Sequence, residues 1–307
     1  MNAAIRAVVR TAIFKGIDVS AVYQGYQGLV NDKLEPFGAR SVANIIGRGG
    51  TILRTARCKS FYEPEGRAQA ARVLQERGIE GLVVIGGDGS FRGASKLHEE
   101  HGIKVIGIPG TIDNDIFGTD VTIGFNTAMN IALDAIDRVR DTAASHDRMF
   151  LVEVMGRHTG HIALNVGVAG GAEAILVPEA EPNVQDVIDA VSKARKRDKE
   201  FSLVIVAEGA YPGGATALAK ELEARGDYDV RTSILGHMQR GGSPSTRDRV
   251  LASRLGHAAV IALTEGRSGV MVGVDKRGTV FVPLIDVFEK VRAFDWELFE
   301  TAKVLAV

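Results

Sequence analysis

Short apolar runs recur along this chain and alternate with stretches of helical periodicity. LVVI at residues 82–85 and LVIV at residues 203–206 are two such runs. Strands that are buried on both faces have this composition, and they occur in parallel sheets covered by helices. The alternation of such strands with helices predicts an α/β fold with mainly parallel sheets.

The same pattern places the individual elements. Strands are expected at residues 18–23, 81–85, 104–109, 149–155, 174–177, 201–208 and 269–274. Helices are expected at residues 2–14, 67–77, 90–101, 125–143, 184–197, 215–225 and 245–264. There is no Pro/Ser-rich linker, so the chain is expected to cross between domains near 122–125 and again near 238–242. Two crossings would give domains built from non-consecutive segments.

Composition and charge exclude several classes of protein. Lys and Arg number 37 against 38 Asp and Glu, so there is no overall positive field for nucleic acid or an anionic membrane. The single cysteine cannot form an internal disulfide, which fits a reducing, cytoplasmic compartment. No run of about 18 apolar residues exists to span a bilayer, and the N-terminal residues, which include Arg6 and Arg10, lack the layout of a signal peptide.

Glycine is in excess at 36 residues, and it gathers in short clusters at predicted strand ends. The first glycine turn, GGDGS at residues 86–90, follows a strand and opens a helix, which is where α/β proteins bind phosphate. Asp88 in this turn could hold Mg²⁺. The alternative interpretation is a tight turn in which Asp88 is the helix N-cap.

The next predicted strand runs into PGTIDND at residues 109–115. Asp113 and Asp115 are two like charges close together, and a turn needs only one such residue. One carboxylate is therefore expected to act as a general base, and the other as an electrostatic or metal-shell partner. The alternative is a solvated turn. The 86–90 and 110–115 loops follow neighbouring strands and are expected to face one crevice.

Several further side chains lie at strand ends or helix ends. The guanidinium of Arg57 suits phosphate, whereas Cys58 has no local histidine partner and is interpreted as a buried or a bystander cysteine. Arg148 and Arg157 are expected at opposite ends of the 149–155 strand. Glu208 ends the 201–208 strand, where it is a functional carboxylate or a surface one.

His237 and Arg240 are three residues apart and could converge on one anion, although a lone histidine is more often structural. The basic cluster at 195–199 either complements a helix C-terminus or binds an anion. Arg6 and Arg10 lie four apart on one helix face, solvated or forming half of an anion site. Arginines, carboxylate loops and glycine turns at strand ends are what phosphoryl transfer requires.

Four stretches together resemble the ATP-dependent 6-phosphofructokinase family of bacterial type. They are IGGDGS at 85–90, PGTIDND at 109–115, EVMGR at 153–157 and GHMQRGGSP at 236–244. The resemblance implies two three-layer α/β domains, discontinuous in sequence. A nucleotide-binding domain would comprise 1–124 and 239–291, and a sugar-phosphate-binding domain 125–238 and 292–307.

The resemblance also implies roles for individual residues. Asp113 would deprotonate the 1-hydroxyl of fructose 6-phosphate, Thr111 and Arg157 would steady the transferring phosphoryl group, and Asp88 would hold Mg²⁺. The residues that would contact ATP are Arg57, Cys58, Gly87, Asp88, Gly89 and Ser90. The residues that would bind the sugar phosphate are Thr111, Ile112, Asp113, Met155, Gly156, Arg157, Glu208, His237, Met238, Gln239 and Arg240.

Further implied features concern assembly and regulation. Arg148 and Arg231 would reach the sugar phosphate from a neighbouring subunit of a homotetramer. An effector site for ADP, the activator, or phosphoenolpyruvate, the inhibitor, would use Arg6, Arg10, Arg140, Glu173, Arg197 and Lys199.

Two glycines favour ATP as the phosphoryl donor. Pyrophosphate-dependent relatives carry an aspartate where this chain has Gly89 and a lysine where it has Gly110, and glycine leaves room for the α-phosphate. A pyrophosphate-dependent kinase is the closest alternative.

The family begins with a strand and a Gly-Gly-Asp-x-Pro-Gly-Met-Asn loop, and this sequence starts partway through that motif. An upstream strand in the natural protein is the simplest expectation. The second alternative, a catalytically impaired regulatory or metabolite-binding protein, depends on the absence of this loop.

Overall fold

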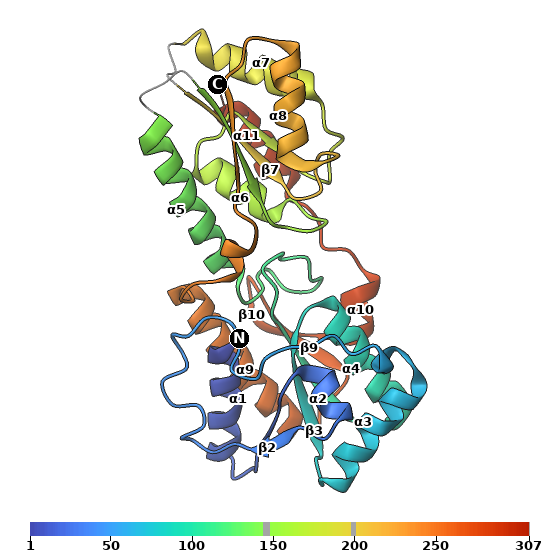
Figure 1. Ribbon diagram of the computed structural model, residues 1–307. Coiled ribbons are helices and arrows are strands. Elements are labelled where there is room, and N and C mark those ends of the chain that lie inside the picture. The colour runs from blue at the N-terminus through green and yellow to red at the C-terminus, as the bar shows by residue number, and fades with distance from the viewer. Residues whose placement is uncertain (144–147, 198–200, 307) are drawn as a thin grey trace. The chain divides into compact units, whose positions relative to one another are not determined.

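The computed structural model describes residues 1–143, 148–197 and 201–306, which form two compact units (Figure 1). Unit 1 comprises Met1–Thr111, Ile116–Gly124 and Ser243–Arg292, and unit 2 comprises Ile112–Asp115, Phe125–Gly242 and Ala293–Val307. Both are therefore discontinuous in sequence.

This division differs from the expected ranges at 112–115, at 239–242 and at residue 292. Residues 239–242 stay with unit 2 because η2 (Gly236–Arg240) is a single 3₁₀ helix that packs on α5. In addition, the side-chain oxygen of Gln239 accepts a hydrogen bond from the Met155 N–H at 2.7 Å.

The sheet of unit 1 has the strand order β10-β9-β4-β3. Its strands are β3 (Gly81–Gly86), β4 (Lys104–Pro109), β9 (Val270–Asp275) and β10 (Gly278–Pro283). Strands β3, β4 and β9 are parallel, and β10 returns antiparallel beside β9. Helices of this unit are α1 (Asn2–Phe14), α2 (Gly25–Val30), α3 (Pro64–Glu76), α4 (Asp88–His101), α9 (Thr246–Thr264) and α10 (Leu284–Glu289).

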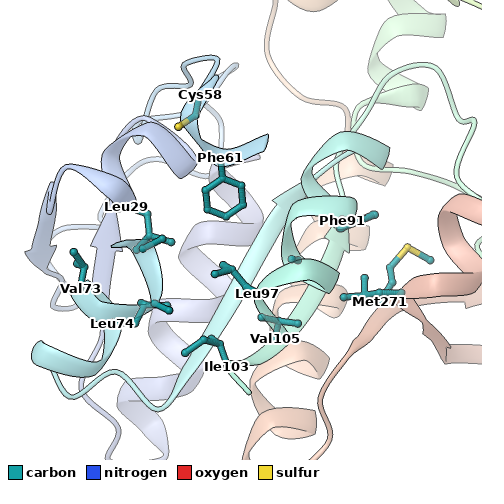
Figure 2. Packing of buried hydrophobic residues seen from close by; sticks show 14 of the residues in the cluster. Leu29, Cys58, Phe61, Val73, Leu74, Phe91, Leu97, Ile103, Val105 and Met271 are labelled. Carbon is teal, nitrogen blue, oxygen red and sulfur yellow. The ribbon is translucent and has the colours of Figure 1, made fainter. Parts of the chain in front are cut away.

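Two hydrophobic clusters cover the two faces of this sheet, because successive side chains of a strand point to opposite sides. Val105 of β4 packs with residues of α3 and α4 such as Leu74 and Phe91, as Figure 2 shows. Its neighbour Ile106 packs instead with residues of α1 and α9, such as Leu255. The unit is thus a three-layer α/β structure in which α1 and α9 lie side by side (Figure 1).

A small two-stranded sheet completes unit 1. β1 (Ser20–Val22) pairs antiparallel with β2 (Leu34–Pro36), so the strand expected at 18–23 exists but lies outside the main parallel sheet. A short 3₁₀ helix, η1 (Ser60–Tyr62), precedes α3. Tyr26 of α2 stacks on Phe61 of η1, with ring centroids 3.9 Å apart.

The sheet of unit 2 has the order β6-β7-β5-β8, and all its neighbouring strands are parallel. The strands are β5 (Arg148–Val154), β6 (Ala174–Leu176), β7 (Phe201–Ala207) and β8 (Val230–Ile234). The helices are α5 (Phe125–Ala143), α6 (His161–Ala169), α7 (Val184–Arg195), α8 (Gly214–Arg225) and α11 (Trp296–Leu305). α6 packs against β7, α5 and α11, whereas α7 and α8 pack against each other and against the strands.

Each strand and helix expected from the sequence corresponds to an element of the structure, and the α/β prediction with mainly parallel sheets is confirmed. Strands β2, β8 and β10 were not expected. Along the described part of the chain, every helix is too short or too polar to cross a lipid bilayer.

Candidate active site

In unit 1, two loops lie side by side at the carboxyl edge of the sheet. β3 and β4 run parallel in a register that places Gly86 opposite Pro109. The Gly110 N–H donates to the Gly86 carbonyl at 2.9 Å, and a Cβ built on Gly87 would lie 3.8 Å from that of Thr111. The expectation that these neighbouring strands bring their loops together is confirmed as far as Thr111.

The first glycine turn is shaped to receive an anion. Gly87 is the N-cap of α4 in extended conformation, and its carbonyl accepts from the N–H groups of Ser90 and Phe91. Gly86 has no room for a side chain, since its Cβ would lie 2.4 Å from Ser90 Oγ. A Cβ on Gly89 would meet nothing within 4 Å. Open space therefore lies at the N-terminus of a 14-residue helix, where the helix dipole attracts phosphate.

Asp88 is the first residue of α4, so it is not the N-cap. Its side chain is 44% exposed and its Oδ2 lies 3.1 Å from Nε of Arg92, one helical turn on. Arg92 also donates to the carbonyl of Phe288. No group of three or more His, Cys, Asp or Glu side chains suited to a metal occurs among the described residues. One accessible carboxylate does fit Mg²⁺ that is held mainly by substrate phosphates and water.

Of the two residues before α3 that are expected to contact ATP, one is accessible and the other is buried. Arg57 is exposed, whereas Cys58 is 9% exposed and belongs to the core (Figure 2). If Cys58 contacts the nucleotide, as the resemblance implies, it is expected to do so through its backbone atoms. The sequence analysis missed Arg67. Its guanidinium donates to the carbonyls of Phe61 and Tyr62 and so holds η1, the turn that follows Arg57 and Cys58.

In unit 2, the two central residues of the segment 112–115 are buried, and the two outer ones are partly exposed. Asp113 is 8% exposed and Asn114 is 3% exposed, so the solvated-turn interpretation is wrong. Asn114 has a φ of 55°, a left-handed conformation that asparagine tolerates better than most residues. The hydroxyl of Thr159 donates to the main-chain carbonyl of Asp113 at 3.1 Å.

Arg157 lies in a tight turn, residues 156–160, at the carboxyl end of β5. A Cβ on Gly156 would lie 2.3 Å from the carbonyl oxygen of Thr159, so only glycine fits there. Arg157 is exposed, with a φ of 57°. Its N–H lies 3.3 Å from Oε2 of Glu208, which follows the adjacent strand β7. The predicted strand-end residues Arg157 and Glu208 are thus neighbours.

η2 presents two exposed side chains and buries a third. His237 and Arg240 are exposed and three residues apart, a spacing that aligns them on one face of a 3₁₀ helix. Met238 is 64% exposed, whereas Gln239 is 1% exposed. Because the Gln239 oxygen accepts from the Met155 N–H, this glutamine holds the backbone at residue 155, and its expected contact with the sugar phosphate stays a prediction.

Arg148 and Arg231 lie at the opposite edge from Arg157. Arg148 begins the seven-residue strand β5, so it is about 20 Å from the strand's carboxyl end. Both arginines contact the carboxylate of Asp229, at 2.8 Å and 3.0 Å. They form a separate cationic cluster, and their expected role in the site would require a second subunit.

The residues expected at an effector site are divided between the units. Arg6 and Arg10 lie on α1 in unit 1. In unit 2, Arg140 donates to the carbonyl of Gly170, and the carboxylate of Glu173, 3% exposed, accepts from the Leu203 N–H. Arg197 follows α7, and Lys199 lies outside the described residues.

Unit 1 has glycine turns at the carboxyl edge of its parallel sheet, and unit 2 has an exposed arginine and a buried carboxylate. These are the residue types of an α/β phosphotransferase. The phosphofructokinase family model matches residues 1–263, and the chain belongs to the phosphofructokinase family.

Curated relatives of high similarity are named as ATP-dependent enzymes. The chain is 55% identical to the ATP-dependent 6-phosphofructokinase 1 of Thermus thermophilus, over all of this chain and 95% of that protein. It is 50% identical to the ATP-dependent 6-phosphofructokinase of Bacillus subtilis, with the same coverage.

Solved structures show the same fold. The phosphofructokinase of Pichia pastoris in the T-state superimposes with a TM-score of 0.89 at 36% identity, covering 99% of this chain and 37% of that longer one. A pyrophosphate-dependent phosphofructokinase of Marinobacter aquaeolei has a TM-score of 0.85 at 25% identity, covering 96% of this chain and 82% of that one.

Proposed function

We propose that this chain is an ATP-dependent 6-phosphofructokinase, a phosphotransferase of glycolysis that converts fructose 6-phosphate to fructose 1,6-bisphosphate. One observation carries the proposal. The first glycine turn, an anion site, lies against Gly110 and Thr111, and the buried Asp113 follows only two residues later in the chain. Thr111, which lies against the proposed phosphate-binding turn, is therefore only two peptide units from the candidate base.

The chemistry follows from these positions. Asp113 accepts the proton of the 1-hydroxyl as that oxygen attacks the terminal phosphorus of ATP, and the bond between this phosphorus and the bridging oxygen of ADP breaks. Arg157 is exposed and cationic, which suits it to the charge on the equatorial oxygens of the phosphoryl group. Thr111 lies against Gly87 and contributes a hydroxyl beside the same group.

The nucleotide is assigned to unit 1. Gly87, Gly89 and Ser90 surround the open N-terminus of α4, where backbone N–H groups meet phosphate. Mg²⁺, which would neutralise phosphate charge, would be held by Asp88 after this carboxylate leaves Arg92. The exposed guanidinium of Arg57 is assigned to contact with the phosphates of ATP.

The sugar phosphate is assigned to unit 2. Glu208 meets the N–H of Arg157, and it can accept a hydrogen bond from a sugar hydroxyl through its other oxygen. His237 and Arg240, aligned on η2, suit the 6-phosphate. Met155 and Gly156 shape the turn, with Gln239 supporting them.

ATP is favoured over pyrophosphate as donor because the space over Gly89 is open. The curated relatives at 50–55% identity are also ATP-dependent by name. Assembly as a homotetramer, control by ADP or phosphoenolpyruvate, and a cytoplasmic location belong to the same proposal.

A coupled assay with ATP, Mg²⁺ and fructose 6-phosphate tests this function. Asp113→Ser is expected to reduce kcat roughly 10²- to 10⁴-fold, the usual contribution of a general base, and to leave sugar-phosphate binding largely intact. Asp134→Ser, on the exposed face of α5, is the matched control and should behave as the unmodified chain. Turnover that survives in Asp113→Ser would refute the assignment of the base.

Two outcomes would replace the proposal. Turnover with pyrophosphate and none with ATP would establish the pyrophosphate-dependent kinase. Binding of fructose 6-phosphate without turnover under either condition would establish the regulatory or metabolite-binding protein.

A further inference from the structure

We infer that Thr159 is a positioning residue for Asp113, through a hydrogen bond from its hydroxyl to the main-chain carbonyl of that residue. This inference rests on the proposed function, because it assigns Thr159 a part in the reaction that Asp113 performs. The observation that carries it is the 3.1 Å contact between Thr159 Oγ1 and the Asp113 carbonyl oxygen.

Asp113 lies in a four-residue segment of unit 2 that is flanked in sequence by segments of unit 1. The chain leaves unit 1 after Thr111, contributes residues 112–115 to unit 2, and returns to unit 1 at Ile116. Both ends are fixed in unit 1, since the Thr111 carbonyl accepts from the Thr122 hydroxyl at 2.7 Å and Ile116 is 1% exposed in the core. The Thr159 contact attaches the middle of the segment to the unit that carries Arg157.

Thr159 itself is held from both sides. Its N–H donates to the Gly156 carbonyl at 3.0 Å and closes the 156–160 turn. On its other side, the N–H of Gly160 donates to both carboxylate oxygens of Glu179, at 2.9 and 3.0 Å. Gly160 has no room for a side chain, because an added Cβ would lie 2.4 Å from Val177, so the turn packs closely on that residue. The hydroxyl therefore projects from a rigid position.

The proton of this hydroxyl has two acceptors within reach. The Gly156 carbonyl lies 3.2 Å from Thr159 Oγ1, but it already accepts the Thr159 N–H. A hydroxyl has one proton to give, and the Asp113 carbonyl is the nearer acceptor. The bond therefore joins the backbone of the base to the turn that bears Arg157, and it keeps the spacing of these two groups constant.

Thr159→Val tests the role, since valine keeps the shape and removes the hydroxyl. Loss of one hydrogen bond is expected to reduce kcat roughly two- to tenfold, with the KM for ATP unchanged. Thr159→Ser keeps the hydroxyl and should restore kcat to within about twofold. Thr301→Val removes an equivalent hydroxyl-to-carbonyl bond on α11 and should leave kcat unchanged.

Two further measurements separate positioning from a general loss of stability. In an Asp113→Ser background, Thr159→Val should have no additional effect on residual turnover, because its effect acts through Asp113. Amide hydrogen exchange should rise in residues 112–115 of Thr159→Val and stay unchanged in Thr159→Ser and Thr301→Val.

Each outcome is decisive. Unchanged exchange at 112–115 in Thr159→Val overturns the inference, whatever the activity. Unchanged kcat with raised exchange shows that the contact exists and has no part in turnover, which also overturns it. If the unmodified chain lacks kinase activity, the proposed function fails, the catalytic role of Thr159 fails with it, and the exchange result still decides whether the contact exists.

Discussion

Arg67 offers the sharpest test of how the nucleotide side of the site is supported. Its side chain is 9% exposed, and its guanidinium binds both oxygens of Glu100, at 2.6 and 2.8 Å. It also donates to the carbonyls of Phe61 and Tyr62, at 3.1 and 2.7 Å. Arg67→Met would keep the apolar stem and remove every one of these hydrogen bonds.

The cost can be worked from these contacts. Breaking a buried ion pair costs about 3–5 kcal/mol. The Glu100 side chain is 31% exposed and can regain water, so the lower end, about 3 kcal/mol, applies. At roughly 2–4 °C per kcal/mol for a unit of this size, the melting temperature should fall by about 6–12 °C.

Thermal unfolding followed by circular dichroism measures this loss. Arg72→Met, on the same helix with an exposed side chain that bonds only Gln69 among the described contacts, is the control and should change stability by less than about 0.5 kcal/mol. The KM for ATP should rise in Arg67→Met, because the turn after Arg57 loses its support, while the KM for fructose 6-phosphate stays constant. A melting temperature equal to that of the control would refute the reasoning.

Three further predictions concern pH and glycine positions. The hydrogen bond from Arg67 lowers the pKa of Glu100 from its ordinary value of 4.5, so the stabilisation is present above that value and is lost as pH falls through the lowered pKa. The difference in melting temperature between the unmodified chain and Glu100→Gln should therefore narrow as the pH falls below 4.5, and a constant difference would contradict the linkage. Gly89→Asp meets no atoms and should leave the melting temperature unchanged while reducing kcat/KM for ATP about tenfold or more by charge repulsion; unimpaired ATP kinetics would contradict the assigned phosphate position. Gly156→Ala places its Cβ 2.3 Å from a carbonyl oxygen, so we expect a loss of about 1–3 kcal/mol in the unfolding free energy together with reduced kcat, and a variant with native stability would show that the turn can open without strain.

The sequence predicts the main sheets of this protein well because their strands carry the signal themselves. The apolar runs at 82–85 and 203–206 lie inside β3 and β7. Residues 203–206 are buried, as expected for a strand covered on both faces, whereas residues 82–85 lie on the edge strand β3 and are only partly buried against the two clusters of unit 1. β8 was missed because its sequence is VRTSI, with three of its five residues exposed. This edge strand forms because it pairs with β5, which lies about 80 residues earlier in the chain (Met149 is opposite Val230). Such distant pairing produces no hydrophobic pattern in the strand's own sequence.

The same distinction separates the site residues that could be predicted from those that could not. Gly87 follows β3, and Arg157 and Glu208 follow β5 and β7. Parallel strands bring their carboxyl ends to one edge of each sheet, so position along the chain was enough to propose these residues as candidates. Thr159 and Glu179 act through hydrogen bonds to backbone groups 46 and 19 residues away, and neither residue type is unusual for a turn. The sequence therefore gives no sign that distinguishes these two residues from other threonines and glutamates in turns. The supports of a site therefore become visible only once the tertiary structure shows which backbone groups they hold, and substitutions at such supports are where the proposed mechanism is most open to test.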